Sequence, residues 1–148
     1  LRAFELLRKR GVKIAVHLIF GLPGEGGKEI LDTVGRIALL SPEGVKIHNL
    51  HIPKSSPLFE EYLQGEISVP SSKRHIQYVA QALELLSEKT VIMRLTTDTA
   101  DDRLGAPLRQ YPKQRVYQEV EKLLKARNTR QGAAFSRLIG GDYAYQRW

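Results

Sequence analysis

The chain has 148 residues, enough for one hydrophobic core, and its hydrophobic fraction of 42% excludes a wholly disordered protein. It contains no cysteine, which excludes disulfides, thiol nucleophiles and cysteine-ligated metal clusters of its own and fits a cytoplasmic location. No apolar run is long enough to span a bilayer, so no membrane partner is expected, and the formal net charge of +7 points either to a polyanionic partner or to solubility alone.

A helix is predicted over residues 1–10, with apolar residues on one side and three basic residues at its end. Basic side chains suit a helix C-terminus because they oppose the exposed carbonyl groups, and Gly11 then ends the helix. This helix begins at the first residue, which is not methionine. The chain is therefore expected to start inside a larger protein.

The stretch over residues 12–25 organises the chain. Residues 13–20 form a near-continuous apolar run, which is typical of a strand buried on both faces. A glycine-rich turn over residues 21–24 follows, and then an amphipathic helix over residues 28–40. A strand, a tight turn and a helix form the repeating unit of parallel α/β folds, which bind ligands above the carboxyl ends of their strands. We therefore expect the functional site at this turn.

Residues 45–52 are predicted as a second strand, which a right-handed crossover places parallel to the first and next to it. A loop over residues 53–57 and a short helix over residues 58–63 come next. A longer helix begins at Ser71 or Ser72, since either serine can cap its N-terminus, and it carries apolar residues on a single face.

Residues 90–96 are β-branched and apolar enough for a third strand, and residues 98–105 are polar and predicted as a loop. The last helix opens at Pro112 or Lys113 and carries an apolar stripe opposite a basic face. No periodicity follows Asn128.

Three segments of the chain, in this order, resemble radical S-adenosylmethionine (SAM) enzymes. The sequence Leu-Ile-Phe-Gly-Leu-Pro-Gly-Glu at residues 18–25 is similar to a late strand and turn of that family's barrel. Residues 46–65, which combine a Lys-Ile-His strand, a small-residue loop, an aromatic helix and a glycine, resemble the Elp3-like branch. The strand over residues 91–96 is similar to the same branch. The residues that suggest YhcC-like members in particular are Ala106, Pro107, Lys113 and Gly132.

The resemblance implies an α/β fold, the C-terminal portion of an incomplete (β/α) barrel of radical SAM type followed by an Elp3-like α+β extension. Residues 1–66 would be the last βα units of the barrel and residues 67–132 a helix–strand–helix extension. Residues 133–148 would be a tail that is disordered or folds only with a partner. The resemblance also implies SAM as cosubstrate and a [4Fe–4S] cluster that splits SAM into methionine and a 5′-deoxyadenosyl radical.

The cluster cysteines of that family lie early in the barrel, and this chain has none. Its cluster ligands are therefore expected in an N-terminal barrel part of the same polypeptide, which becomes an implied partner. The chain alone is predicted to be inactive, and no catalytic residue is assigned within it.

By the same resemblance, Ile19 is expected near the adenine face of SAM and the backbone of residues 50–52 near the adenine edge. The glycines of the turn would let SAM approach, although a strand-to-helix turn requires glycine in any case. The turn precedes a helix N-terminus, which suits a carboxylate or phosphate, but no lysine follows in P-loop spacing and a nucleotide triphosphatase is not expected. The predicted cofactor-binding residues are Ile19, Gly21, Gly24, Leu50, His51 and Ile52.

The histidines on the predicted strands, His17, His48 and His51, form a poor zinc site. Alternation sends His48 and His51 to opposite faces, and no carboxylate lies near them on these strands. His48 is instead predicted to point into the barrel and to contact substrate or SAM. His75 is predicted to be a solvated residue of its helix.

Three aspartates, Asp98, Asp101 and Asp102, raise the question of a Mg²⁺ or Ca²⁺ site. Their spacing does not match an EF-hand loop, and Arg94 and Arg103 are close enough in sequence to neutralise them. A charged loop without a metal is therefore predicted.

Positive charge concentrates in the last helix and just after it. The predicted RNA-binding residues there are Lys122, Lys125, Arg127 and Arg130. Such a cluster is either an ordinary solvated face or a surface for an RNA backbone, and the excess charge of the segment favours RNA. Because Elp3-like enzymes modify tRNA, the resemblance implies tRNA as the substrate.

Two alternatives remain open. The chain could belong to a non-catalytic RNA-binding module that keeps the scaffold without the cluster, and cysteines with cluster spacing upstream of residue 1 would decide against this. It could also belong to a porphyrin-type radical SAM oxidase, which would need a small-molecule pocket and no surplus positive charge.

Overall fold

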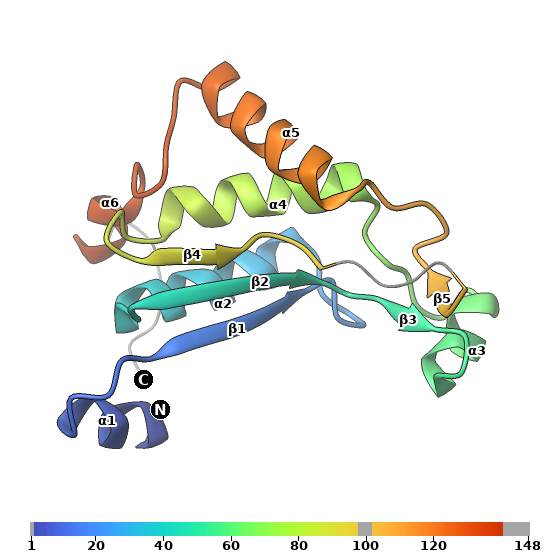
Figure 1. Ribbon diagram of the computed structural model, residues 1–148, viewed down its shortest axis with the longest axis horizontal. Coiled ribbons are helices and arrows are strands. Elements are labelled where there is room, and N and C mark those ends of the chain that lie inside the picture. The colour runs from blue at the N-terminus through green and yellow to red at the C-terminus, as the bar shows by residue number, and fades with distance from the viewer. Residues whose placement is uncertain (1, 98–101, 141–148) are drawn as a thin grey trace.

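The computed structural model describes residues 2–97 and 102–140. In chain order its elements are α1 (Arg2–Lys9), β1 (Ala15–Phe20), α2 (Gly27–Leu40), β2 (Gly44–Asn49), β3 (Ile52–Pro53), α3 (Pro57–Leu63), α4 (Ser72–Leu85), β4 (Val91–Arg94), β5 (Leu104–Ala106), α5 (Lys113–Ala126) and α6 (Phe135–Ile139). The strands form one three-stranded sheet in the order β1–β2–β4 and one two-stranded sheet of β3 and β5 (Figure 1). The predicted α/β class is confirmed. Within the described residues, no helix has both the length and the apolarity that crossing a bilayer requires.

The three-stranded sheet is parallel throughout. β1 lies along β2, with Ala15 opposite Gly44 and Phe20 opposite Asn49, and β4 lies along the other side of β2. Parallel neighbours need a long connection, which α2 provides between β1 and β2. The predicted unit of two parallel strands joined by a helix is therefore confirmed.

The pairing of β2 with β4 contains one irregularity. Val45 lies opposite Ile92, whereas the next residue of β2, Lys46, lies opposite Arg94. Met93 is therefore an extra residue in β4. This is the arrangement of a β-bulge, which redirects the side chains around it.

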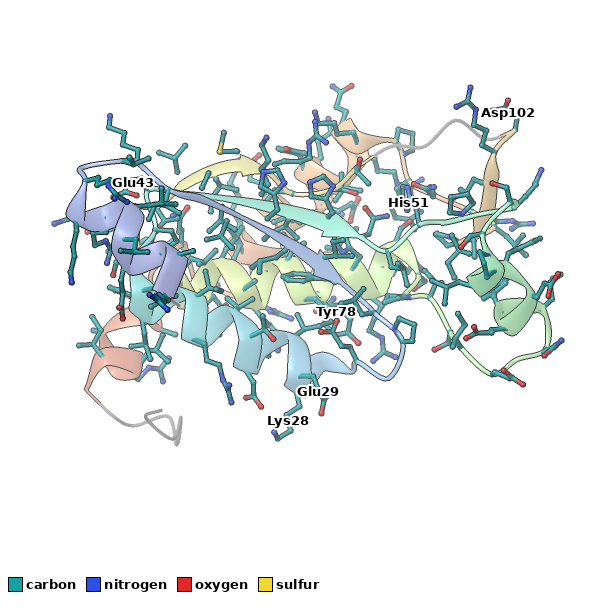
Figure 2. All side chains as sticks on the ribbon, turned by 90° about the horizontal axis from the view of Figure 1, so that it is seen from below. Lys28, Glu29, Glu43, His51, Tyr78 and Asp102 are labelled. Atoms are coloured by element: carbon teal, nitrogen blue, oxygen red, sulfur yellow. The ribbon has the colours of Figure 1, made fainter. Side chains whose placement is uncertain are left out.

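The main hydrophobic core lies between one face of this sheet and the helices α2 and α4, which Figure 2 shows on the same side of the strands. Alternate strand residues point into the core because side chains along a strand alternate between its two faces. The buried residues of β1 and β2 are Leu18, Phe20, Val45 and Ile47. The helices contribute Ile30, Val34, Ala38, Ile76, Val79, Leu83 and Leu86, with Val116 and Val120 from α5. The apolar faces predicted for these helices are confirmed.

The opposite side of the sheet, which we call the open face, is not covered by α2 or α4. It comprises Ala15, His17 and Ile19 of β1, Lys46 and His48 of β2, and Met93 and Arg94 of β4. Ile19 is 49% exposed and Met93 50%. The expectation that residues 13–20 form a strand buried on both faces is therefore wrong. An apolar run in the sequence indicates a strand, but it does not show whether helices of this chain cover both faces of that strand.

β3 and β5 pair antiparallel and build a smaller core beyond the end of β2 (Figure 1). Ile52 lies opposite Ala106, and both are buried with Leu50 against apolar side chains of α3. Two expectations are corrected here. The second strand ends at Asn49 instead of running to residue 52, and residues 104–106 form a strand instead of a loop. Strands of two and three residues are too short to show an alternating pattern.

A short helix follows the last predicted element. The sequence shows no periodicity after Asn128, yet Phe135–Ile139 form α6, and Leu138 is buried in the main core. A helix of five residues is too short to display an apolar period.

Parts of the predicted organisation lie outside the described residues. These are residues 141–148 of the predicted tail, and Asp98 and Asp101 of the predicted charged loop. The predicted boundary between the barrel part and the extension, at residues 66 and 67, stays a prediction. The three-stranded sheet contains β1 and β2 from before this boundary and β4 from after it.

The turn between β1 and α2 depends on two glycines in the left-handed region, which side chains make unfavourable. Gly21 has a φ of 87° and Gly24 a φ of 80°. A Cβ atom on Gly21 would lie 2.4 Å from Cγ and Cδ of Pro70, whereas a Cβ on Gly24 would meet nothing within 4 Å. Gly21 is therefore required by its backbone and by its contact with Pro70, and Gly24 by its backbone alone.

His75, which is predicted to be solvated, is instead buried, with 2% of its surface exposed. Its Nε2 lies 2.8 Å from the carbonyl oxygen of Leu95, and its ring lies beside that of Phe20. A carbonyl only accepts, so Nε2 carries the proton and donates. Burial lowers the pKa of His75 to about 4. The spacing from His75 to Val79 and Leu83 is that of one helix face, a signal that the sequence already contained.

We expect Gly21→Ala to lower the free energy of unfolding of the complete polypeptide more than Gly24→Ala does. The left-handed backbone costs an alanine about 1–2 kcal/mol at either position. Only at Gly21 does the clash with Pro70 add to this. Urea unfolding followed by circular dichroism compares both variants with the natural protein. Equal losses would mean that Pro70 moves aside freely, contrary to the tight contact.

We also expect the contribution of His75 to stability to depend on pH. Its folded pKa of about 4 lies below its ordinary value of 6.5, so the unfolded chain binds the proton first. The free energy of unfolding that neutral His75 contributes is therefore lost as the pH falls from about 6.5 towards 4. The complete loss is on the order of 3 kcal/mol. His75→Gln, which does not titrate, should be closer in stability to the natural protein at pH ~5 than at pH ~7.5. Urea midpoints of both proteins measure this, and a difference independent of pH would contradict it.

Candidate functional site

The open face brings together residues from two neighbouring strands. The register places Ile19 opposite His48 and His17 opposite Lys46. The rings of His17 and His48 stack, with centroids 5.8 Å apart and planes inclined by 22°. An exposed apolar side chain, two imidazoles and a lysine therefore share one patch of the sheet.

His48 is the most distinctive residue of this patch. Within the described residues, its Nε2 is buried and has no hydrogen-bond partner. Burial lowers the pKa of His48 below its ordinary value, and the nearby Arg94, His17 and Lys46 lower it further. The lowered pKa favours the neutral ring, and the Nε2 atom is a buried polar group without a partner in the described chain. The surrounding positive charge favours a ligand group that is negative or rich in electrons.

At the carboxyl end of β2, the side chain of Asn49 connects two strand ends. Its Oδ1 accepts hydrogen bonds from Thr96 Oγ1 at 2.8 Å and from the backbone N–H of Thr97 at 3.1 Å. Its Nδ2 lies 2.6 Å from His51 Nε2, and because an amide nitrogen only donates, this histidine nitrogen accepts. Figure 2 shows His51 at the end of the sheet opposite to Glu43. Sequence reasoning missed Asn49, whose only signal is a polar amide at the end of an apolar strand.

The other predicted cofactor-binding residues are placed differently from Ile19. Leu50 and Ile52 bury their side chains in the smaller core, and the N–H of Leu50 donates to the carbonyl oxygen of Phe20. Gly21 is buried under Pro70, and Gly24 is exposed in the turn. The structure thus brings Ile19 and His48 together on the open face. Because the side chains of Leu50 and Ile52 are buried, residues 50–52 could contact SAM only through their backbone and the side chain of His51. All SAM contacts stay predictions.

The chain does not fit an iron–sulfur cluster. Such a cluster needs thiolate ligands, and the sequence has no cysteine. In the part of the chain that the structure describes, no three residues among His, Cys, Asp and Glu gather as a metal site would require. Asp102 is exposed, and its carbonyl oxygen accepts a hydrogen bond from Lys54 Nζ.

The predicted RNA-binding residues lie on α5 and just after it, and α5 packs on α4, away from the open face (Figure 1). All four are exposed. Lys125 pairs with Glu121 at 2.7 Å, and Arg127 donates a hydrogen bond to Gln77 Oε1. In the described part of the chain neither Lys122 nor Arg130 makes an ion pair, so both charges stay available to a ligand.

Comparison with known proteins shows similarities to a family model and to curated proteins. Residues 42–126, more than half of the chain, match the model of the Radical_SAM C-terminal domain. An uncharacterized protein of Methanocaldococcus jannaschii, MJ0486, is 36% identical over 138 residues, which are 93% of this chain and 43% of that protein. YtqA of Bacillus subtilis is 32% identical over 132 residues, 89% of this chain and 41% of YtqA. Protein YhcC of Escherichia coli is 31% identical over 107 residues, 72% of this chain and 35% of YhcC.

Among solved structures, an archaeal Elp3 of Methanocaldococcus infernus with an N-terminal deletion matches with a TM-score of 0.76. The match covers 92% of this chain and 34% of that one at 19% identity, so it shows a common fold. The chain thus spans less than half the length of each of these relatives. From the domain match, the curated relatives and the shared fold together, the chain belongs to the radical SAM C-terminal domain family, in its YhcC- and Elp3-like branch.

Proposed function

We propose that this chain is the C-terminal part of a cytoplasmic radical SAM enzyme that cleaves SAM reductively with a [4Fe–4S] cluster and acts on tRNA. The cluster is held by residues outside this chain, because the chain has no thiolate to offer. The N-terminal barrel part of the same polypeptide is therefore its first partner.

The open face is the observation that carries the SAM part of the proposal. It is the uncovered face of a parallel sheet, and Ile19 and His48 lie near the carboxyl ends of β1 and β2, where parallel α/β folds bind ligands. Ile19 offers an exposed apolar surface that suits an adenine ring, and His48 offers an unpartnered Nε2. The positive charge around His48 suits the carboxylate of SAM.

When bound beside the cluster, SAM would supply the radical chemistry that starts with hydrogen abstraction from the substrate. The residues of this chain would bind and orient SAM and keep water from it. A neutral His48 suits a binding role, because a lowered pKa leaves the ring uncharged and still able to make a hydrogen bond at neutral pH.

The tRNA part of the proposal is supported by the basic residues at the end of the chain. Lys122, Lys125, Arg127 and Arg130 are exposed, and the whole chain carries a net charge of +7. Phosphate contacts from lysine and arginine supply most of the affinity of proteins for nucleic acid. The resemblance of the sequence to the Elp3-like branch, which implies tRNA as the substrate, agrees with this.

A non-catalytic RNA-binding module is the second candidate, and one observation favours it. The basic residues of α5 lie apart from the open face, so RNA could bind without SAM. The two candidates differ in whether the complete polypeptide cleaves SAM.

We expect the complete polypeptide, reconstituted anaerobically with iron and sulfide and then reduced, to convert SAM to 5′-deoxyadenosine and methionine. Residues 1–148 alone should hold no stoichiometric iron and form neither product, because they lack thiolates. Iron assay and chromatography of the products measure both.

The variant His48→Ala provides a control for the open face in the same assay. It should keep the iron content of the natural protein and bind SAM about tenfold more weakly, the effect of one lost hydrogen bond to a charged group. Absence of deoxyadenosine from an iron-loaded natural protein would favour the RNA-binding module, and unchanged SAM binding by His48→Ala would remove His48 from the site.

We expect Lys122→Gln to weaken tRNA binding by the complete polypeptide and to flatten its salt dependence. Each lost phosphate contact lowers the slope of log affinity against log salt by about one unit. Lys89→Gln is the matched control, since Lys89 is an exposed lysine beyond the far end of α4. Filter binding at several salt concentrations measures both slopes. An equal slope for Lys122→Gln and natural protein would make Lys122 an ordinary surface residue.

A further inference from the structure

A hollow of about 350 Å³ lies between α4 and α5, which Figure 1 shows side by side. Its polar lining consists of Lys73 and Gln77 from α4, Tyr111 before α5, and Arg115, Glu119 and Lys122 from α5. The α5 residues are spaced by four and three, so they share one face of the helix. We call this hollow the α4–α5 groove. Its volume lies within the range of small-molecule sites, about 300–1,000 Å³.

At the mouth of the groove, Arg115 lies over the ring of Tyr111. The guanidinium carbon is 3.8 Å from the ring centroid. Tyr111 is held in turn by its backbone N–H, which donates to Ser72 Oγ at 3.0 Å. Arg115 is exposed, so the side of its guanidinium away from Tyr111 faces solvent. A planar cation is thus held in place by an aromatic ring with one side free.

The surroundings of Arg115 are basic and not neutralised. Tyr111 and Arg115 also line an adjoining hollow of about 570 Å³, together with Arg109 and Gln110. In the described part of the chain none of the basic residues that line the two hollows (Lys73, Arg109, Arg115 and Lys122) makes an ion pair. Glu119 is the acidic residue among the lining residues.

A second observation points to a ligand with polar edges. Within the described residues, Nε2 of Gln110 is buried and lacks a hydrogen-bond partner. A buried amide donor without a partner is unfavourable by itself and becomes favourable when a ligand supplies an acceptor. Ring nitrogens and carbonyl oxygens of nucleobases are such acceptors.

We propose that the α4–α5 groove binds a nucleotide of a single-stranded RNA segment, with its base stacked on Arg115 and its phosphates near Lys73 and Lys122. Arginine planes stack on unpaired bases, and lysines on both walls match the charge of the flanking phosphates. Gln110 lies in the adjoining hollow, which Arg115 also lines, and its unpartnered amide marks that side for the polar edge of the base or of a neighbouring base. This inference rests on the proposed action on tRNA and adds how an unpaired base of that RNA is held.

The test compares two oligonucleotides of about ten nucleotides, an oligoadenylate and an abasic strand of equal length. The complete natural polypeptide should bind the adenylate strand more tightly, because only it can stack. Arg115→Lys keeps the charge and loses the plane, so it should weaken adenylate binding about five- to tenfold and leave abasic binding unchanged. Lys122→Gln should weaken both strands equally. Arg10→Lys, an exposed arginine after α1, is the matched control and should change neither.

A second readout uses 2-aminopurine in place of one adenine, whose fluorescence falls on stacking. The natural protein should quench it and Arg115→Lys should not, a change that a merely structural role of Arg115 would not produce. Equal affinity of the natural protein for both strands would overturn the stacking of a base on Arg115 and would leave tRNA binding in place. An acidic protein would then be the favoured occupant of the α4–α5 groove. Failure of the natural protein to bind either strand or tRNA would overturn both proposals.

Discussion

α2 and α4 pack on a single face of a parallel sheet, and the rest of the structure depends on this one-sided burial. Because strand residues alternate, burying Leu18 and Phe20 obliges Ile19 to point to the open face. A slip of β1 by one residue would bury His17 and Ile19 and expose the large apolar residues that now form the core. The hydrophobic core therefore fixes which side chains of the strands face away from it, on the open face.

Much of this arrangement could be predicted from the sequence, because long elements carry periodic signals. The strand, turn and helix around Gly21 and the single apolar face of α4 follow from spacing alone. Three features did not follow. The number of faces of β1 that are covered depends on what packs above the strand. β3 and β5 are too short to show a pattern. His75 was predicted to be exposed because histidine is polar, although its spacing matched the buried face of α4. For the candidate site, the family resemblance named Ile19 and strand alternation named His48, and both roles stay predictions. Neither line of reasoning named Asn49, whose hydrogen bonds go to threonines that lie distant in sequence.

The two positively charged regions differ in physical character. On the open face, Arg94 and Lys46 act on a partly buried imidazole, so their effect is felt over short distances and is weakly screened by salt. Around α5 the charges are exposed, and their attraction extends about one Debye length and weakens as salt rises. The first arrangement suits recognition of one small group, and the second suits the capture of a long polyanion from solution. α4 and the sheet separate them, so one molecule would have to be large to contact both.

The bulge at Met93 has a consequence for how the open face can evolve. The extra residue lets Arg94 lie opposite Lys46, where a regular ladder would have placed Met93. Deletion of Met93 would therefore remove the bulge and leave Arg94 in its place opposite Lys46. The positive charge beside Lys46 thus depends on the register of β4, so an insertion that displaced Arg94 from this position would alter the charge of the open face, whereas the loss of Met93 would not.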